Sequence, residues 1–486
     1  MKIFSRYYKS VLISVIFSLL QGVTAQEKTD FPPLEPLFVY ENEGELSGED
    51  IIRAALEFSL CKQDSEEGKT VLNQFSLLEN EVTSENFLSL PEEQRAEKIL
   101  TLMYEKLLKK YSFNQTYIDL MFQRGTYNCV SSSVLYYALA KSAGITVHGN
   151  ETPNHAFCTV YLSDGRKIDV ETTNPNGFNP GTKKNLGSSG NSQKYYVVPK
   201  KSYNNRKEVG ERKFISLIGK NVTALFDEKK DYKTTVPLSA ARIVFVGQTS
   251  ESDEKSVRES FEIAATNYAV SLDRQKKSDL ALDWMDAVEN RWGNFWNPKY
   301  RKLYDDIAYN MAVNLTNKNM AERAQEIFDS KKEKISEKNR ITIQTTIFYA
   351  YINEKTHKMS PDEAISFIHE MKNDENAKDK SVAAKLFSLE EYYWSEKSKP
   401  LAKAKKHLEA AAVMEEGLKY LPNSKNLKNI RIQHLNNYIV EVHNKFVDFY
   451  NKKDYENAEK IIKDAIAILP ESGTLKQDLK MVQGKK

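Results

Sequence analysis

The chain contains, in one short stretch, the pattern of a helix followed by two strands, and few folds accommodate that order. Apolar residues recur at helical spacing over residues 130–139, and Gly144 is a natural end for that helix. Residues 155–162 (HAFCTVYL) alternate small apolar residues with others, as a strand of a half-buried sheet does. A turn at 163–165 and a returning strand over 166–171 complete a hairpin. This pattern predicts a mixed α+β domain.

Three kinds of reactive side chain occur in that stretch in a meaningful order. Cys129 falls in the first turn of the helix, where free N–H groups and the helix dipole favour a thiolate. His155 begins the first hairpin strand, and Asp169 and Glu171 lie on the second. A cysteine, a histidine and a carboxylate are the parts of a thiol nucleophile, its base and the group that orients the base. An ordinary buried cysteine at a helix start is the alternative interpretation.

The face on which the acids lie depends on the length of the hairpin turn. A three-residue turn sets Asp169 opposite Thr159 and Glu171 opposite Phe157. Both acids then share the face of His155, because opposite residues point the same way and the side-chain period is two. A two-residue turn would put both acids on the other face. The catalytic interpretation therefore requires the three-residue turn.

The same stretch resembles the transglutaminase-like superfamily. The matching pieces are Asn128-Cys129 leading into a helix that ends at residues 142–145 (SAGI), then His155-Ala156-Phe157, then residues 168–173 (IDVETT). The resemblance covers about residues 50–200 and implies a papain-like α+β fold. It also implies a nucleophilic cysteine at a helix N-terminus, with the histidine and the acid on following strands.

Carried over position by position, the resemblance makes Cys129 the nucleophile and His155 the base. The family's usual aspartate favours Asp169 as the orienting acid, whereas proximity within the hairpin favours Glu171, and we rank Asp169 slightly ahead. Gln123 stands six residues before Cys129, the spacing at which papain-like enzymes keep an oxyanion-hole glutamine. Phe157 stands where the family often has tryptophan.

The sequence gives less support to other roles for these residue types. Cys129, His155 and Cys158 lack the paired CxxC or second histidine of a typical zinc site, so neither a metal nor another cofactor is expected. His148 is a second candidate base, but a lone histidine in such a place is usually structural. Three cysteines are too few for a disulfide framework, and we expect Cys61 and Cys158 to be buried thiols, with a bridge between them as the alternative.

From about Glu211 onward the sequence is helical and internally repetitive. Two sets of residues share the gaps 9, 4, 3 and 5: Leu401, Ala410, Met414, Gly417 and Pro422, and Phe449, Ala458, Ile462, Ala465 and Pro470. These gaps resemble those of the tetratricopeptide repeat, with small residues where helices cross and a closing proline. Equivalent alanines at 324, 364, 410 and 458 are 40, 46 and 48 residues apart, against about 34 in the regular repeat, so the array is degenerate.

Such an array implies a solenoid of stacked helix pairs with an exposed concave surface. Tetratricopeptide arrays typically bind peptides or partner proteins, so a protein or peptide substrate or partner is expected here. A spacer or brace for the first domain is the alternative.

The N-terminus has the pattern of a secretory leader. Lys2, Arg6 and Lys9 precede the largely apolar residues 11–20, and Val23-Thr24-Ala25 offers a cleavage site. The apolar run is shorter than the roughly 20 residues of a membrane span, although an uncleaved anchor remains the alternative. Cleavage would bring the formal charge of +3 to zero, which argues against nucleic-acid binding. An exported protein, periplasmic or secreted and without a membrane span after cleavage, is expected.

The predicted organisation of the 486 residues is a signal peptide (1–25), an extended segment (26–48), a transglutaminase-like α+β domain (49–205) and an all-α tetratricopeptide-like solenoid (206–486). The first functional hypothesis is an exported cysteine hydrolase or acyltransferase acting on protein or peptide amides. The second is a catalytically silent fold that serves as an interaction scaffold or assembly adaptor.

Overall fold

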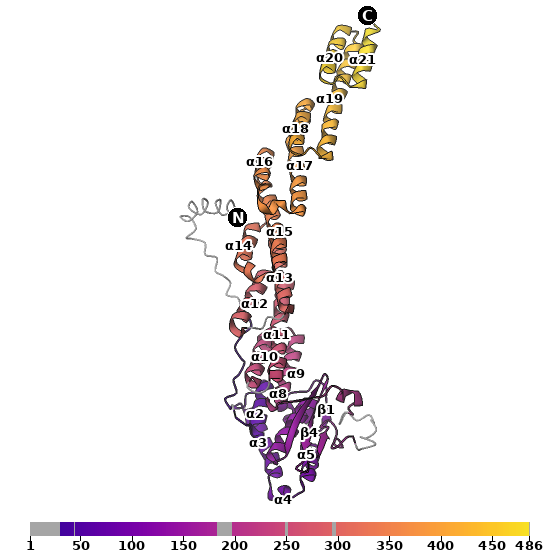
Figure 1. Ribbon diagram of the computed structural model, residues 1–486. Helices are drawn as coiled ribbons and strands as arrows, with labels where there is room; N and C mark the ends of the chain where they lie inside the picture. Colours follow the sequence, from indigo (N-terminus) through magenta and orange to yellow (C-terminus); the bar gives the residue numbers. More distant parts are fainter. Residues whose placement is uncertain (1–29, 43, 182–196, 248–250, 294–297, 486) are drawn as a thin grey trace, which may run out of the picture. The chain divides into compact units, whose positions relative to one another are not determined.

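A computed structural model describes residues 30–42, 44–181, 197–247, 251–293 and 298–485 (Figure 1). The predicted signal peptide lies outside the described residues. The described chain divides into two compact units, one that ends at Tyr300 and one that begins at Arg301. Most of it is helical, with one small antiparallel sheet in the first unit.

In the first unit, helices both precede and follow this sheet along the sequence. Its elements are α2 (Gly48–Phe58), α3 (Glu66–Val82), α4 (Glu85–Leu88), α5 (Glu92–Lys106), β1 (Lys110–Tyr111), α6 (Ile118–Arg124), β2 (Thr126–Tyr127), α7 (Cys129–Ser142), β3 (Thr146–Thr152), β4 (His155–Tyr161), β5 (Lys167–Val170), the 3₁₀ helix η1 (Lys200–Tyr203), β6 (Lys207–Val209), α8 (Glu211–Ile215), α9 (Leu217–Glu228), α10 (Tyr232–Val246), α11 (Glu251–Arg274) and α12 (Ser278–Trp292).

The sheet has the strand order β5-β4-β3-β6, and every neighbouring pair is antiparallel. Thr159 lies opposite Asp169, and the N–H of Leu162 donates to the carbonyl oxygen of Arg166 at 2.9 Å. The predicted three-residue turn and its register are therefore confirmed. This register leaves Ala156, Cys158 and Val160 on one face of β4 and the more polar residues on the other.

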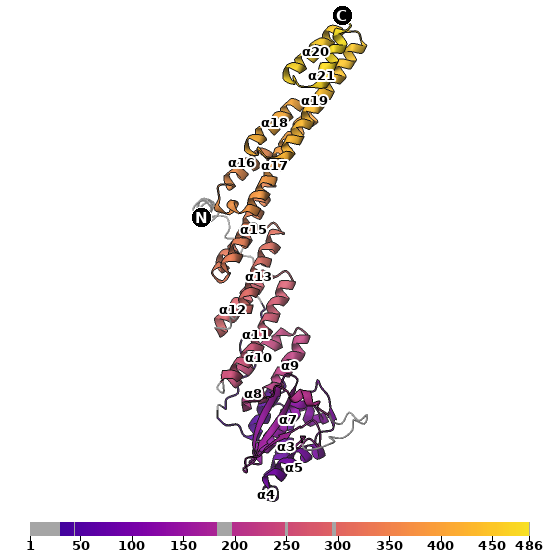
Figure 2. The same cartoon turned by 45° about the vertical axis from the view of Figure 1, so that its right-hand side comes forward.

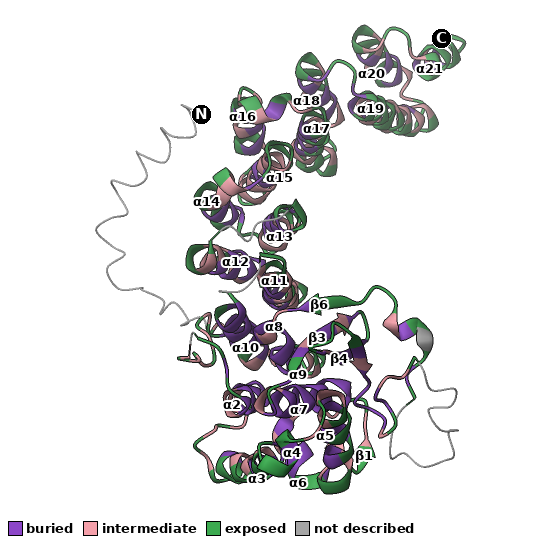
Figure 3. Cartoon of the chain, turned by 60° about the horizontal axis from the view of Figure 1, so that its bottom comes forward, coloured by how far each residue is buried: buried purple, intermediate pink, exposed green. Residues whose placement is uncertain are grey.

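Helix α7 lies at the centre of the first unit. Its first twelve residues are all buried, and Figure 3 shows it in purple among its neighbours. It contacts α2 and α5, and β3 and β4 pack on it. Figure 2 shows α7 beside the strands of the sheet. Ser132 and Ser133 of α7 both hydrogen-bond the Thr172 hydroxyl at 2.8 Å, and Ser133 Oγ also donates to the carbonyl oxygen of Ala156 at 3.4 Å. The packing brings the start of α7 beside the start of β4.

The described part of the predicted extended segment, residues 30–42 and 44–47, has no regular structure and lies along later helices. The N–H of Leu37 donates to the Pro237 carbonyl at 2.9 Å, and the Trp292 indole donates to the Leu34 carbonyl at 3.0 Å. The Phe38 ring meets the Phe58 ring edge-on at 4.9 Å. Because α8, α9 and α10 also pack on α2 and on one another, the compact units divide after Tyr300, later than the sequence-based boundary at residue 206.

The second unit consists of helices that follow one another along the chain. They are α13 (Pro298–Thr316), which begins just before the unit boundary, α14 (Ala321–Lys331), η2 (Lys332–Lys334), α15 (Glu337–Thr356), α16 (Pro361–Met371), η3 (Glu375–Lys378), α17 (Lys380–Lys403), α18 (His407–Tyr420), α19 (Lys425–Asn451), α20 (Tyr455–Ile468) and α21 (Gly473–Gln483).

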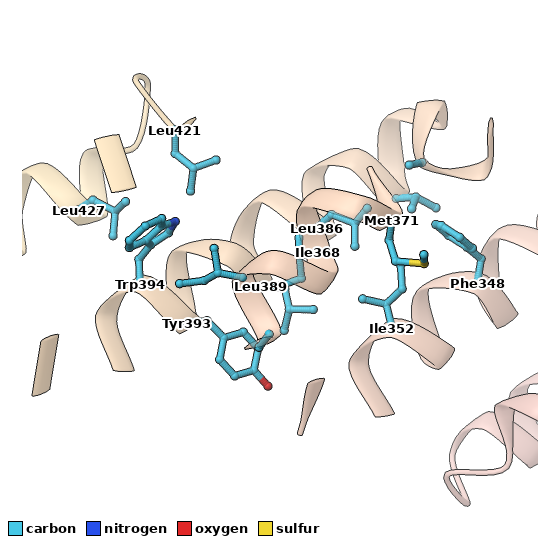
Figure 4. Packing of buried hydrophobic residues seen from close by; sticks show 14 of the residues in the cluster. Phe348, Ile352, Ile368, Met371, Leu386, Leu389, Tyr393, Trp394, Leu421 and Leu427 are labelled. Atoms are coloured by element: carbon cyan, nitrogen blue, oxygen red, sulfur yellow. The ribbon is translucent and has the colours of Figure 1, made fainter. Parts of the chain in front are cut away.

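Each helix from α14 to α21 contacts the next, an arrangement compatible with a helical solenoid. The residues predicted at helix crossings are buried in both sets, among them Ala410 and Met414 on α18 and Ala458 and Ile462 on α20. Figure 4 shows one of the cores, in which Trp394 of α17 lies beside Leu421 and Leu427. Among the described residues, none of the helices combines the length and the apolar content that crossing a membrane requires.

Candidate active site

Cys129 is the first residue of α7, as predicted, and the residue before it caps the helix. The Asn128 side-chain oxygen accepts from the N–H groups of Val130 and Ser131, both at 3.0 Å. Its amide nitrogen donates to the carbonyl oxygen of Phe113 at 3.2 Å. Asparagine is among the best N-cap residues because its short side chain reaches these otherwise free N–H groups. The cap fixes the backbone on which Cys129 sits, and the Cys129 side chain is buried, with the residue 8% exposed.

His155 begins β4, and its ring interacts with both Glu171 and Cys129. Its Nε2 lies 2.7 Å from Glu171 Oε2, and Cys129 lies close enough to the ring to raise its pKa. Because Glu171 occupies Nε2, Nδ1 is the nitrogen available to the sulfur. The Phe157 ring lies nearly parallel to the imidazole at 6.0 Å between centroids. The nucleophile, base and acid predicted by the sequence therefore come together in the first unit.

Glu171 is almost wholly buried, and hydrogen bonds surround its carboxylate. Oε1 accepts from the N–H of Thr173 at 3.1 Å and from its hydroxyl at 2.7 Å. Oε2 accepts from the Tyr203 hydroxyl at 2.6 Å in addition to facing His155. The backbone N–H of Glu171 donates to the Gly177 carbonyl at 2.9 Å. A buried carboxylate with this many donors is held in one orientation.

Asp169, which the sequence ranks slightly ahead of Glu171, is placed elsewhere. Its two oxygens accept from the two terminal nitrogens of Arg206 at 2.7 and 2.8 Å, and Oδ1 also accepts from the Thr159 hydroxyl at 2.7 Å. It shares a face with Glu171 but lies opposite Thr159, nearer the hairpin turn and farther along the strand from His155. The structure thus puts Glu171, and not Asp169, against the imidazole.

The remaining candidates lie outside this group. Gln123 is exposed near the end of α6, and the structure gives its side chain no hydrogen bond to Cys129 or His155. His148 on β3 pairs with Glu208 at 2.8 Å. Cys158 is fully buried, with its sulfur 3.4 Å from the Ser133 carbonyl oxygen. All three cysteines are free thiols, and in the described part of the chain no cluster of three or more histidines, cysteines or acids is arranged to hold a metal ion.

The charges of His155 and Glu171 support each other. Burial lowers the pKa of His155, but its interactions with the nearby Cys129 and with the hydrogen-bonded, charged Glu171 outweigh burial and raise the pKa to about 10. Burial raises the pKa of Glu171, but hydrogen bonding and attraction to His155, and the hydroxyls of Tyr203 and Thr173, hold it below its usual value. Near neutral pH the pair is therefore an imidazolium and a carboxylate.

Sequence reasoning missed Tyr203, Thr173 and Arg206. Thr173 lies two residues after Glu171, and its N–H and hydroxyl contacts form a local turn that spacing alone could have suggested. Tyr203 and Arg206 follow Glu171 by more than thirty residues in the sequence and reach the site only through the tertiary fold. Nothing in the sequence near them marks a functional role.

Replacing Gly177 with alanine is expected to displace Glu171. A Cβ at this position would lie 1.9 Å from the Glu171 carbonyl oxygen, so the backbone would have to move. Overpacking of this kind typically costs about 1–3 kcal/mol. We expect a lower unfolding midpoint and slower alkylation of Cys129 by iodoacetamide. Gly181→Ala is the matched control, because a Cβ there meets no atom within 4 Å; equal effects from both variants would contradict the prediction.

Comparison of the chain with protein-family models, with curated proteins and with solved structures gives no significant match.

Proposed function

We propose that this protein is a thiol enzyme that acts on amides of proteins or peptides through Cys129, His155 and Glu171. The observation that carries the proposal is the surroundings of the imidazole, which hydrogen-bonds a buried, fully hydrogen-bonded carboxylate and has Cys129 close enough to raise its pKa. Structural cysteines seldom have such a partner, whereas a base held by a third group is typical of an activated nucleophile.

The proposed chemistry is acyl transfer. In the reacting form His155 already holds the proton that Cys129 has given up, and the thiolate sulfur attacks the amide carbonyl carbon. The carbon–nitrogen bond then breaks as His155 returns the proton to the leaving amine, and an acyl-thioester remains on Cys129. Water completes hydrolysis, or an amine completes transfer. Glu171 keeps the imidazole in one orientation and stabilises its charged form.

Two features support a wider assignment within this proposal. The order of nucleophile, base and acid along one helix and an antiparallel hairpin resembles the transglutaminase-like superfamily, and we place residues 49–205 there, with Glu171 in the position of the acid. The degenerate repeat spacing and the successive helices of the second unit support a tetratricopeptide-like array that binds a protein or peptide partner. Export from the cytoplasm remains part of the proposal and rests on the leader pattern of residues 1–25.

One observation favours the second candidate, a catalytically silent scaffold. Cys129 is only 8% exposed, so a substrate carbonyl has little access to the sulfur unless neighbouring groups move. In that case the papain-like domain would serve as a structural part of an adaptor.

Alkylation of the purified protein with iodoacetamide separates the two candidates. We expect Cys129 to be labelled rapidly below pH 7, and the His155→Ala substitution to slow that labelling by about tenfold or more, because the imidazolium no longer stabilises a thiolate. Mass spectrometry identifies which of Cys61, Cys129 and Cys158 carries the label, and Cys129→Ala is the negative control. Slow labelling of Cys129 with a profile that His155→Ala leaves unchanged would exclude the enzyme and leave the scaffold.

A further inference from the structure

Tyr203 lies against the proposed catalytic group although it follows Glu171 by more than thirty residues. Its hydroxyl donates to Glu171 Oε2 at 2.6 Å, and this is the same oxygen that faces His155 Nε2. Its ring meets the imidazole edge-on at 5.8 Å and the Phe157 ring at 5.2 Å. Tyr203 therefore contacts both the acid and the base.

Arg206 attaches the same segment to the sheet a short distance away. Its guanidinium makes a two-pronged ion pair with Asp169 and donates to the Thr159 hydroxyl at 3.0 Å. It also lies 4.8 Å from the centre of the Phe157 ring. Planar, two-pronged pairing of this kind fixes orientation better than a single contact does.

Tyr203 and Arg206 each contact one acid of the returning strand. Tyr203 donates to Glu171, which directly follows β5, and Arg206 pairs with Asp169 on β5. Asp169 and Glu171 are two residues apart and point to the same face, so a segment that crosses this face can reach both. Between Tyr203 and Arg206 the chain turns at Asn205, whose φ of 57° lies in the left-handed region that asparagine tolerates. Because Tyr203 and Arg206 lie on the same short, turned segment, fixing either residue reduces the conformational freedom of the other.

We infer that residues 203–206 form a clasp that positions Glu171 for the proposed reaction, with Tyr203 holding the carboxylate and the Arg206–Asp169 pair holding Tyr203. The inference rests on the proposed function of Cys129, His155 and Glu171. Tyr203, Arg206 and Asp169 are positioning residues, since they act through Glu171. Asp169 therefore has a positioning role in the site although it does not contact the imidazole.

The clasp makes a specific prediction for Tyr203→Phe, which keeps the ring and removes the hydroxyl. Glu171 Oε2 then loses one of its two donors, so the carboxylate is less fixed and takes up a proton at higher pH. Alkylation of Cys129 at neutral pH is expected to slow about tenfold, the effect of losing one hydrogen bond to a charged group. The acid side of the alkylation profile is expected to move to higher pH.

The role of Arg206 is tested by a double-mutant cycle. If Arg206 acts by holding Tyr203, Arg206→Gln slows alkylation in the wild-type background but adds little to Tyr203→Phe. Independent, multiplicative effects would overturn the coupling. Tyr161→Phe is the matched control, because it removes a hydroxyl that contacts the exposed carboxylate of Glu208, and it is expected to leave the rate unchanged.

A second readout does not depend on thiol reactivity. The ring N–H signals of ¹⁵N-labelled histidine report the His155–Glu171 hydrogen bond directly, and His155→Ala identifies them among the seven histidines. We expect Tyr203→Phe and Arg206→Gln to shift the His155 N–H signal and to speed its exchange with water. An unchanged signal and exchange rate in both folded variants would overturn the clasp. Slow alkylation of the wild type with changed signals in the variants would instead overturn only the proposed function.

Discussion

Replacing Glu171 with alanine is expected to destabilise the first unit by about 3–5 kcal/mol, because it leaves a buried imidazolium without its counter-charge. The side chains of His155 and Glu171 are 4% and 1% exposed, so neither can turn to water in compensation. The substitution also removes the acceptor of the Tyr203 and Thr173 hydroxyls. Scanning calorimetry gives the change in midpoint, and hydrogen exchange of α7 and β4 assigns it to this unit.

The pH dependence of this loss has a defined sign. The pKa of Glu171 lies below its usual value, so its contribution to stability is complete above about pH 4.5 and is lost as the pH falls further. The pKa of His155 is raised to about 10, so its contribution is complete below about pH 6.5 and is lost as the pH rises toward 10. The stability difference between wild type and Glu171→Ala is therefore expected to be largest between about pH 4.5 and 6.5 and to narrow at higher pH. A difference that grows from pH 6.5 to 10 would contradict the ion pair.

Replacing Glu390 with alanine is expected to give the largest loss of stability in the second unit, about 2–4 kcal/mol. The Glu390 side chain on α17 is 0% exposed and pairs with His369 of α16 at 2.7 Å and with Lys372, which directly follows that helix. It also accepts from the buried Trp394 indole at 3.2 Å. The side chains of His369 and Lys372 are about a third exposed and can turn to water, so the expected loss is smaller than for a fully buried pair.

The control for Glu390 is an exposed acid of the same unit. Glu409 pairs with Lys406 at 3.3 Å, and both side chains are more than half exposed. Such pairs contribute about 0–1 kcal/mol, so Glu409→Gln should leave the unfolding midpoint nearly unchanged. Burial raises the pKa of Glu390, but Lys372 and His369 outweigh it and lower the pKa, so the contribution of Glu390 is lost as the pH falls below its usual range. Equal midpoints for the two variants at neutral pH would show that the buried cluster does not stabilise the unit.

The sequence by itself determined the features that depend on local spacing. The helix that starts at Cys129 follows from its apolar period and from the capping asparagine before it. The hairpin register follows from the length of its turn, and it sets Asp169 and Glu171 on one face. The burial of Ala410 and Ala458 follows from repeat spacing. These patterns are readable because backbone geometry repeats every two or 3.6 residues.

Only the tertiary structure decided between the two acids. A period of two cannot distinguish Asp169 from Glu171, since both satisfy it, and the choice depends on how far along the strand His155 lies and on which acid meets Arg206. The outward position of Gln123 and the arrival of Tyr203 likewise depend on contacts between residues far apart in the sequence.

The division of the chain has the same physical basis. The sequence pattern changes near residue 206, but helices α8 to α12 belong to the first unit, because packing energy depends on which surfaces meet and not on where a pattern begins. Local spacing thus determined the elements and the faces of their side chains. Long-range packing and charge pairing decided which of those side chains meet.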